Sequence, residues 1–196
     1  KEKFSYSELA NLITKVSNSF KNYGLVKGDV VTLISENSPR WLIADQGLMR
    51  LGAINAVRGI NSPSVELEYI IEHSNSVGLI VQSKEVWLKL NKKNELKKRF
   101  KFIINLEDEQ FEDLINWPEF IKAGEKNLLK NNSFEKYNHH SNDIASILYT
   151  SGTTGKPKGV PLTHANFLHQ IINLAHIADP EPGTSVLSVL PIWHSY

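Results

Sequence analysis

Cysteine is absent from the 196 residues, methionine occurs once, and the formal charges sum to only +1. The lack of cysteine excludes disulfide scaffolds and thiolate metal sites, and it suits a reducing compartment. A net charge near zero gives no indication of a nucleic-acid partner. No apolar run approaches the 18 residues of a membrane-spanning helix, and the N-terminus lacks a signal-peptide core. These absences predict a cytoplasmic protein without a transmembrane segment, with peripheral membrane contact left open.

Short apolar segments alternate with longer amphipathic segments along most of the chain. Hydrophobic residues make up 41% and charged residues 22%, as in ordinary globular domains. Capping residues predict helix starts at Ser5, Ser38 and Ser62, and glycines predict ends at Gly24 and Gly52. A further helix is expected over Lys84–Arg99. The expected strands are Val30–Ile34, Ile54–Val57, Gly78–Val81, Phe102–Ile104, the segment beginning at Ile144, and Ser185–Leu190. This alternation predicts an α/β fold with parallel βαβ layers.

The pattern weakens between residues 106 and 142, where acidic and polar residues replace the apolar segments. We expect irregular structure there, with one or two short helices. The regular pattern resumes at Ile144, with a strand, a loop, a short connection and a helix over Thr163–His176. A phosphate-binding loop between a strand and a helix is a recurring arrangement of nucleotide sites.

The stretch Tyr149–Gly159 reads YTSGTTGKPKG and concentrates Ser, Thr, Gly and Lys. Glycines allow backbone N–H groups to approach a ligand closely, hydroxyl groups donate hydrogen bonds, and lysines neutralise phosphate charge. A Walker loop is excluded, because Gly152 and Gly155 are too close together and Pro157 follows Lys156. A flexible connector is the remaining alternative, and the strand before the loop and the helix after it argue against that reading.

The run DIASILYTSGTTGKPKGVPLTHAN, from Asp143 to Asn166, resembles the signature loop of the adenylate-forming (AMP-binding) superfamily. This superfamily contains acyl-CoA synthetases, luciferases and peptide-synthetase adenylation domains. The opening run FSYSELANLI and the segment GLVKGDVVTLISENSPRWLIADQGLMRLGAINA resemble the first part of the same enzymes. The resemblance implies that residues 1–196 are the N-terminal fragment of the large AMP-binding domain. That fragment would divide into a first α/β part (1–105), an irregular connector (106–142) and the phosphate-loop and acyl-pocket segment (143–196).

The resemblance also implies site residues. Lys158 would lie nearest the β- and γ-phosphates of ATP, whereas Lys156 is as easily read as a solvated charge. The implied ATP phosphate-binding residues are Thr150, Ser151, Gly152, Thr153, Thr154, Gly155 and Lys158. Trp193 and His194 would wall the acyl-substrate pocket, although a packed aromatic with a hydrogen-bonded histidine is the alternative for them. The C-terminal domain with the family's catalytic lysine is absent, so no catalytic residue is assigned.

The implied reaction joins ATP and a long-chain fatty acid to an acyl-adenylate and then transfers the acyl group to a thiol. That thiol belongs to coenzyme A or an acyl-carrier protein, and Mg²⁺ would be bound mostly by residues beyond the fragment. The run WHSY, from Trp193 to Tyr196, is similar to a branch that includes acyl-acyl-carrier-protein synthetases. Two alternatives remain: a ligase for an aryl or amino acid, and a non-catalytic nucleotide-binding fragment.

Two other clusters have simpler readings. His139, His140 and Asp143 contain metal-binding residue types, but adjacent loop histidines rarely converge on one metal, so no metal site is predicted. Lysines between Lys84 and Lys101 form the one basic cluster, and their spacing fits the solvated face of an amphipathic helix. Nucleic acid is therefore not an expected partner.

Overall fold

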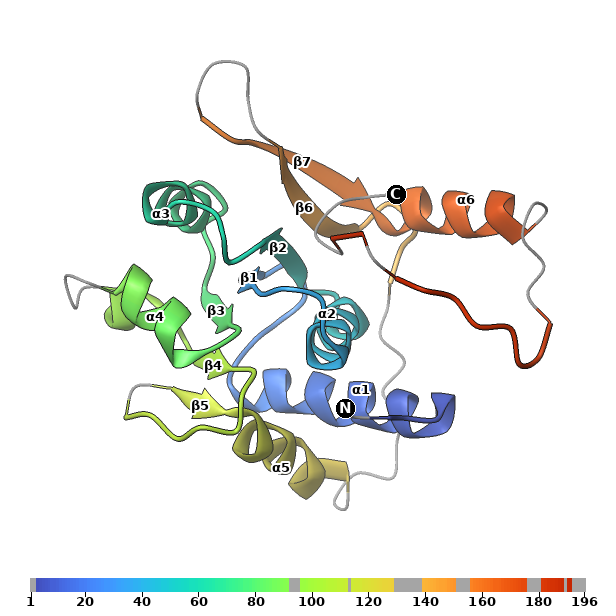
Figure 1. Cartoon of the computed structure of the whole chain (residues 1–196), viewed down its shortest axis with the longest axis horizontal. Coiled ribbons are helices and arrows are strands. Elements are labelled where there is room, and N and C mark those ends of the chain that lie inside the picture. The colour runs from blue at the N-terminus through green and yellow to red at the C-terminus, as the bar shows by residue number, and fades with distance from the viewer. Residues whose placement is uncertain are drawn as a thin grey trace.

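The computed structural model describes residues 3–91, 96–112, 114–128, 139–150, 156–175, 181–188 and 190–191. Its centre is a seven-stranded sheet with the strand order β5-β4-β3-β1-β2-β6-β7 (Figure 1). The strands are β1 (Val30–Ile34), β2 (Ile54–Arg58), β3 (Gly78–Val81), β4 (Ile103–Asn105), β5 (Ile115–Asn116), β6 (Ile144–Thr150) and β7 (Lys158–Thr163). All neighbouring strands pair in parallel except β6 and β7, which are antiparallel. The predicted α/β fold with a parallel sheet is confirmed.

Helices cover both faces of the sheet. They are α1 (Tyr6–Asn22), α2 (Pro39–Leu51), α3 (Ser64–His73), α4 (Lys84–Leu90), α5 (Trp117–Leu128) and α6 (His164–Ala175), with a 3₁₀ turn η1 (Leu96–Arg99). Helices α1, α2 and α5 pack on one face around Phe20 and Phe120, and α3 and α4 pack on the other around Trp87. Among the described helices, none has the length and apolar content that a membrane crossing requires.

The predicted helix boundaries follow from capping. The Ser5 and Glu8 side chains form a reciprocal capping box at the start of α1. The Ser38 hydroxyl accepts a hydrogen bond from the Trp41 N–H at the start of α2. Gly52 ends α2 with φ of 80°, a left-handed conformation that glycine adopts without steric cost. Local sequence is therefore sufficient to predict these ends.

The single helix predicted over Lys84–Arg99 is wrong, because α4 ends at Leu90. Asn91 follows, and its side-chain Oδ1 accepts a hydrogen bond from the N–H of Leu96, five residues further along the chain. An asparagine side chain that bonds the backbone in this way competes with helix continuation. The helical pattern resumes only as the short η1 turn.

The strand predicted over Ser185–Leu190 is wrong for residues 185–188, which have no regular secondary structure. Val186 and Leu187 are 83% and 84% exposed. A strand needs a neighbour to satisfy its backbone groups, and no strand in the described ranges pairs with this segment.

Two elements interrupt the stretch expected to be irregular. Helix α5 lies against α1, where the Ser19 hydroxyl donates to the Phe120 carbonyl oxygen at 2.5 Å. Strand β5 adds two residues to the edge of the sheet beside β4. The expected short helix is thus present, whereas strand β5 was not predicted.

Candidate functional site

The phosphate-loop sequence joins the two antiparallel strands of the β6–β7 hairpin. The predicted short connection between loop and helix is strand β7, and α6 begins directly after it. Thr163 caps α6, since its hydroxyl accepts a hydrogen bond from the Asn166 N–H. The positive end of that helix is therefore one strand length away from the loop instead of adjoining it.

Thr150 and Lys158 form the last residue pair of the hairpin before the loop. Directly opposed residues of an antiparallel pair place their side chains on the same face, with Cβ atoms about 5 Å apart. Both residues are exposed. One hydroxyl donor and one ammonium group are thus side by side and accessible to an anion at the base of the loop.

Tyr149 anchors this base from inside the protein. Its side chain is 2% exposed, and its hydroxyl lies 2.9 Å from Nδ1 of His73 on α3. Burial raises the pKa of Tyr149 to about 12, with a further contribution from Tyr69, so the phenol stays neutral at physiological pH. The residue before Thr150 is therefore fixed by packing and by a polar contact.

Gly159 allows the two strands to approach closely at the same place. A Cβ atom at this position would lie 3.0 Å from Cγ2 of Ile147 and 3.2 Å from Cζ of Tyr149. Both contacts are tighter than ordinary packing, so a side chain would push β7 away from the tyrosine ring. The glycine after Lys158 thus helps to set the position of that lysine.

Lys156 has a different environment from Lys158. Its Nζ lies 5.5 Å from the centroid of the Tyr69 ring on α3, within the range of a cation–π contact. Lys158 begins β7 and is exposed. The two lysines of the loop are therefore not equivalent.

Most of the predicted loop lies outside the described residues, namely Ser151, Gly152, Thr153, Thr154 and Gly155. The predicted acyl-pocket residues Trp193 and His194 also lie outside them. Just before these two, the Leu190 carbonyl oxygen accepts a hydrogen bond of 2.7 Å from Nδ2 of Asn37. Since Asn37 follows β1, the chain at Leu190 returns to the carboxyl ends of the parallel strands, where α/β sheets bind ligands.

Asp143, at the start of the loop sequence, serves as a structural tie. Its carboxylate accepts the His140 N–H at 2.8 Å and pairs with Lys27 at 2.7 Å. These contacts lower the pKa of Asp143 to about 2, with the backbone hydrogen bond as the larger cause. Its carbonyl oxygen accepts the His164 N–H, so the entry to β6 is joined to the start of α6. The sequence prediction considered the Asp143 side chain only as part of a metal cluster with His139 and His140, so this structural role was missed.

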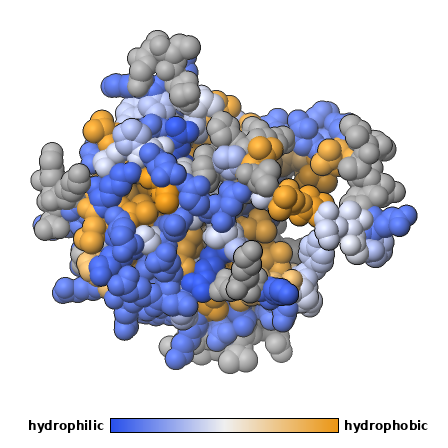
Figure 2. All heavy atoms as spheres, in the orientation of Figure 1, coloured by the Kyte–Doolittle hydropathy of each residue, from blue (hydrophilic) through white to orange (hydrophobic). Residues whose placement is uncertain are grey.

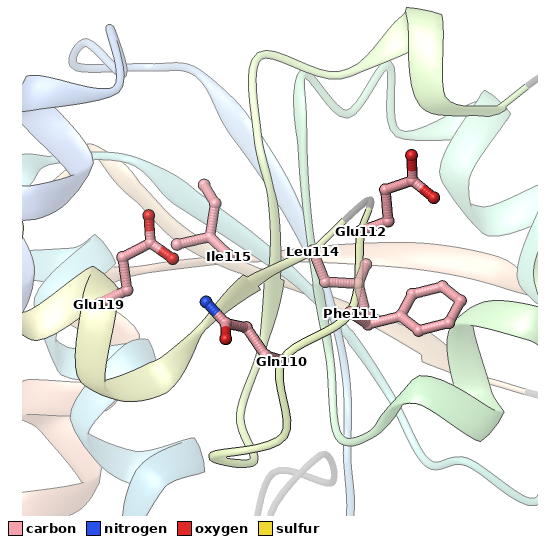
Figure 3. A pocket seen from close by; sticks show the side chains of 6 residues that line it. All are labelled: Gln110, Phe111, Glu112, Leu114, Ile115 and Glu119. Carbon is pink, nitrogen blue, oxygen red and sulfur yellow. The ribbon is translucent and has the colours of Figure 1, made fainter.

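A separate hollow of about 470 Å³ lies at the other edge of the sheet, beside β5 (Figure 3). Its lining residues are Gln110, Phe111, Glu112, Leu114, Ile115 and Glu119. In the strand order, β5 and the β6–β7 hairpin are at opposite ends. This hollow is therefore no part of the site at the hairpin.

The whole chain, including the β6–β7 hairpin, matches a known protein family. The AMP-binding enzyme family model matches residues 1–196, which is the whole chain. The chain belongs to the AMP-binding enzyme family. The family resemblance found in the loop and in the opening segment is thereby confirmed.

Among curated relatives, two proteins of Arabidopsis thaliana are similar along almost the whole chain. One is named "Probable acyl-activating enzyme 16, chloroplastic" and is 39% identical over 98% of this chain and 29% of its own length. The other, a chloroplastic long-chain-fatty-acid–[acyl-carrier-protein] ligase, is 36% identical over 99% of this chain and 29% of its own length. The chain thus spans about three tenths of the length of these relatives.

Solved structures support the same fold. A long-chain-fatty-acid-CoA ligase from Archaeoglobus fulgidus has a TM-score of 0.82 at 24% identity, over 99% of this chain and 37% of its own. ATP-bound MatB from Rhodopseudomonas palustris has a TM-score of 0.79 at 24% identity, over 98% of this chain and 36% of its own. At such identities the likeness establishes the fold alone, the α/β architecture with a mostly parallel sheet.

Proposed function

We propose that the full-length protein carrying these 196 residues activates a long-chain fatty acid with ATP and transfers the acyl group to a thiol. The observation that carries this proposal is the hairpin base, where Thr150 and Lys158 flank the family's loop sequence on one face. Support for the fatty acid comes from the named substrate of a 36% identical relative. Residues 1–196 would form the opening part of the AMP-binding domain.

The chemistry requires charge neutralisation more than covalent help. The fatty-acid carboxylate attacks the α-phosphorus of ATP, the acyl-adenylate forms, and pyrophosphate leaves. A thiolate then attacks the acyl carbonyl and AMP leaves. In phosphoryl transfer, positioning and electrostatic stabilisation of the leaving oxygens supply most of the acceleration. Bound Mg²⁺ would add positive charge at the phosphates.

This chain's own residues would hold the phosphates. The Lys158 ammonium and the Thr150 hydroxyl are open donors at the hairpin base, which fits the β- and γ-phosphates of ATP. The loop residues Ser151, Gly152, Thr153, Thr154 and Gly155 would add backbone and hydroxyl donors. Trp193 and His194 would bound the acyl chain, and coenzyme A or an acyl-carrier protein would accept it. We propose action in an aqueous compartment such as the cytoplasm.

The test is ATP–pyrophosphate exchange by the full-length protein with a panel of acids. Exchange that depends on palmitate, followed by thioester formation with coenzyme A or holo-acyl-carrier protein, is the expected result. Exchange only with an aryl or amino acid would replace the fatty acid by another substrate class. ATP binding without exchange for any acid would leave a nucleotide-binding protein and refute the ligase.

A further inference from the structure

Strand β6 extends past its parallel neighbour at the point where the loop begins. The β2–β6 ladder pairs Asn55 with Ser146, Ala56 with Ile147 and Val57 with Leu148, and then it stops. Among the described strands, Tyr149 and Thr150 have ladder pairs only in β7, namely Gly159 and Lys158. The inner side of the strand carrying the loop is therefore without a ladder for its last two residues.

Arg58, the last residue of β2, replaces the missing ladder with its side chain. Its Nη1 donates a hydrogen bond of 2.9 Å to the Tyr149 carbonyl oxygen. The backbone of Arg58 is held in turn, because its carbonyl oxygen accepts the Ser35 N–H after β1. The contact links residues 91 positions apart and connects the end of β6 to the centre of the sheet.

The guanidinium group is itself fixed on its other edges. Nη2 lies 2.6 Å from Oε1 of Glu66 on α3, and Nε donates to the Ser62 hydroxyl at 3.0 Å. The Arg58 and Glu66 side chains are only 15% and 20% exposed. A planar guanidinium can serve three partners at once, whereas an ammonium group is a single point charge on a flexible stem.

Arg58 and His73 thus hold the same residue from two sides. Arg58 binds the Tyr149 carbonyl oxygen, and His73 contacts the Tyr149 hydroxyl. The next residue is Thr150, which faces Lys158 across the hairpin. A shift of Tyr149 would move both proposed phosphate-binding side chains together.

We propose that Arg58 is a positioning residue for the base of the β6–β7 hairpin, where it holds the Tyr149 carbonyl oxygen next to Thr150 while Glu66 pairs with its guanidinium group. This inference rests on the proposed function, since the loop must bind ATP for its position to matter. Arg58 makes no contact with substrate in this scheme. It acts by holding the hairpin base in the geometry that receives the phosphates.

Arg40 offers a matched control for a substitution at Arg58. Its Nη1 also donates to a backbone carbonyl oxygen, that of Leu106 at 2.7 Å, and pairs with a carboxylate, that of Asp108 at 2.6 Å. Its side chain is 20% exposed, close to the value for Arg58. Leu106 follows β4, which is separated from β2 by β3 and β1. Arg40→Met therefore removes an equivalent tie at a place remote from the loop.

The experiment measures MgATP binding by titration calorimetry, together with melting temperature, for the full-length wild type, Arg58→Met, Arg58→Lys and Arg40→Met. We expect a lower melting temperature for both methionine variants, with the larger drop in Arg58→Met because the Glu66 side chain is 20% exposed and that of Asp108 is 64% exposed. The dissociation constant for ATP should rise at least tenfold in Arg58→Met and less than twofold in Arg40→Met. The dissociation constant of Arg58→Lys for ATP should lie between those of Arg58→Met and wild type. Equal ATP affinities in Arg58→Met and Arg40→Met would refute the positioning role and leave Arg58 a structural tie.

Palmitate-dependent ATP–pyrophosphate exchange on the same proteins separates this inference from the proposed function. If wild type binds ATP but shows no exchange with any acid, the ligase proposal fails and the comparison of ATP affinities still decides the role of Arg58. If wild type binds no ATP, both proposals fail. If exchange is present, the KM for ATP should rise in Arg58→Met more than in Arg40→Met.

Discussion

The two ends of the sheet differ in how their side chains are covered. At the β1–β3–β4 end, helices lie on both faces and the strand residues are almost completely buried, including Leu33, Ile80 and Ile104 at 0% exposure. At the β6–β7 end, Val160 is 42% exposed and Ile171 on α6 is 63% exposed. Figure 2 shows apolar surface around α6 in the same view. The first region has a complete core, and the described part of the second does not.

This difference assigns stability and chemistry to different parts of the molecule. Burial of apolar area supplies most of the stability of a domain, and the β1–β4 region provides most of that area. The hairpin carries Thr150 and Lys158 and is fixed by a few directed contacts, such as those of Arg58 and His73 with Tyr149. Substitutions in the first region should therefore change unfolding, and substitutions in the second should change activity.

The largest effect on stability is expected for Gly124→Leu, where α5 crosses α1. A Cβ atom at Gly124 would lie 1.9 Å from the Lys15 carbonyl oxygen and 2.6 Å from the Ser19 hydroxyl. The helices would have to separate, at a cost of about 3 kcal/mol, the upper end of the typical range for overpacking. Urea unfolding would measure this loss, with Lys122→Leu on the exposed side of α5 as the control. An unfolding free energy close to that of the control would mean that α5 is not part of the complete core.

Lys158→Ala should slow ATP–pyrophosphate exchange at least tenfold in the full-length protein, because a charge-assisted phosphate contact contributes about 1.5–3 kcal/mol. The unfolding free energy should hardly change, since Lys158 is exposed. Lys156→Ala is the matched control, and its effect should be smaller because Lys156 lies over the Tyr69 ring. Equal losses of exchange in the two variants would contradict the distinction between the two lysines. A normal exchange rate in Lys158→Ala would show that Lys158 is not part of the phosphate site.

The structure of the β1–β3–β4 end of the sheet was largely predictable from the sequence, because its sequence signals are local. The capping box at Ser5 and Glu8 and the left-handed Gly52 are decided within a few residues. The short apolar segments are long enough for one strand each and appear where they were expected. The parallel pairing of these strands follows from their alternation with helices along the chain.

The hairpin region was predicted less well, because its structure depends on distant partners. The segment between the loop and α6 was expected to be only a short connection, yet it forms β7. Pro161 is tolerated in β7 because β7 is the edge of the described sheet. The contact of Arg58 with Tyr149 has no local signal, since neither residue's neighbours indicate the other. Residues 185–188 have a strand composition without a strand partner. Local pattern therefore located the loop sequence between β6 and β7 but not the contacts that hold its base.

Asp45→Asn should sharpen the comparison at the boundary between the regions, since Asp45 on α2 is 4% exposed and accepts a hydrogen bond from Asn55 on β2. Burial raises the pKa of Asp45 to about 7. The folded state then binds a proton that the unfolded state has lost, so stability falls between about pH 4 and pH 7. Asn removes that loss, so it should stabilise the protein at pH 8 by up to about 1.4 kcal/mol per unit of pKa shift and by little near pH 4. Thermal unfolding across this range is the measurement, and a pH-independent difference would show that Asp45 does not titrate with a raised pKa.

The smallest effect on stability is expected for Ile171→Lys on the exposed face of α6. Leu168, Ile171, Ile172 and Leu174 are each more than half exposed in the 196-residue chain. A lysine at Ile171 should change the unfolding free energy of that chain by less than about 0.5 kcal/mol, as at other surface positions. Ile43→Lys is the matched control, because Ile43 is 1% exposed and a buried, unpaired charge is strongly destabilising. Sedimentation should also show less self-association for Ile171→Lys than for wild type, since exposed apolar patches promote association. A loss of stability as large as that of Ile43→Lys would show that this face of α6 is packed within the chain, and the contrast between the two ends of the sheet would not hold.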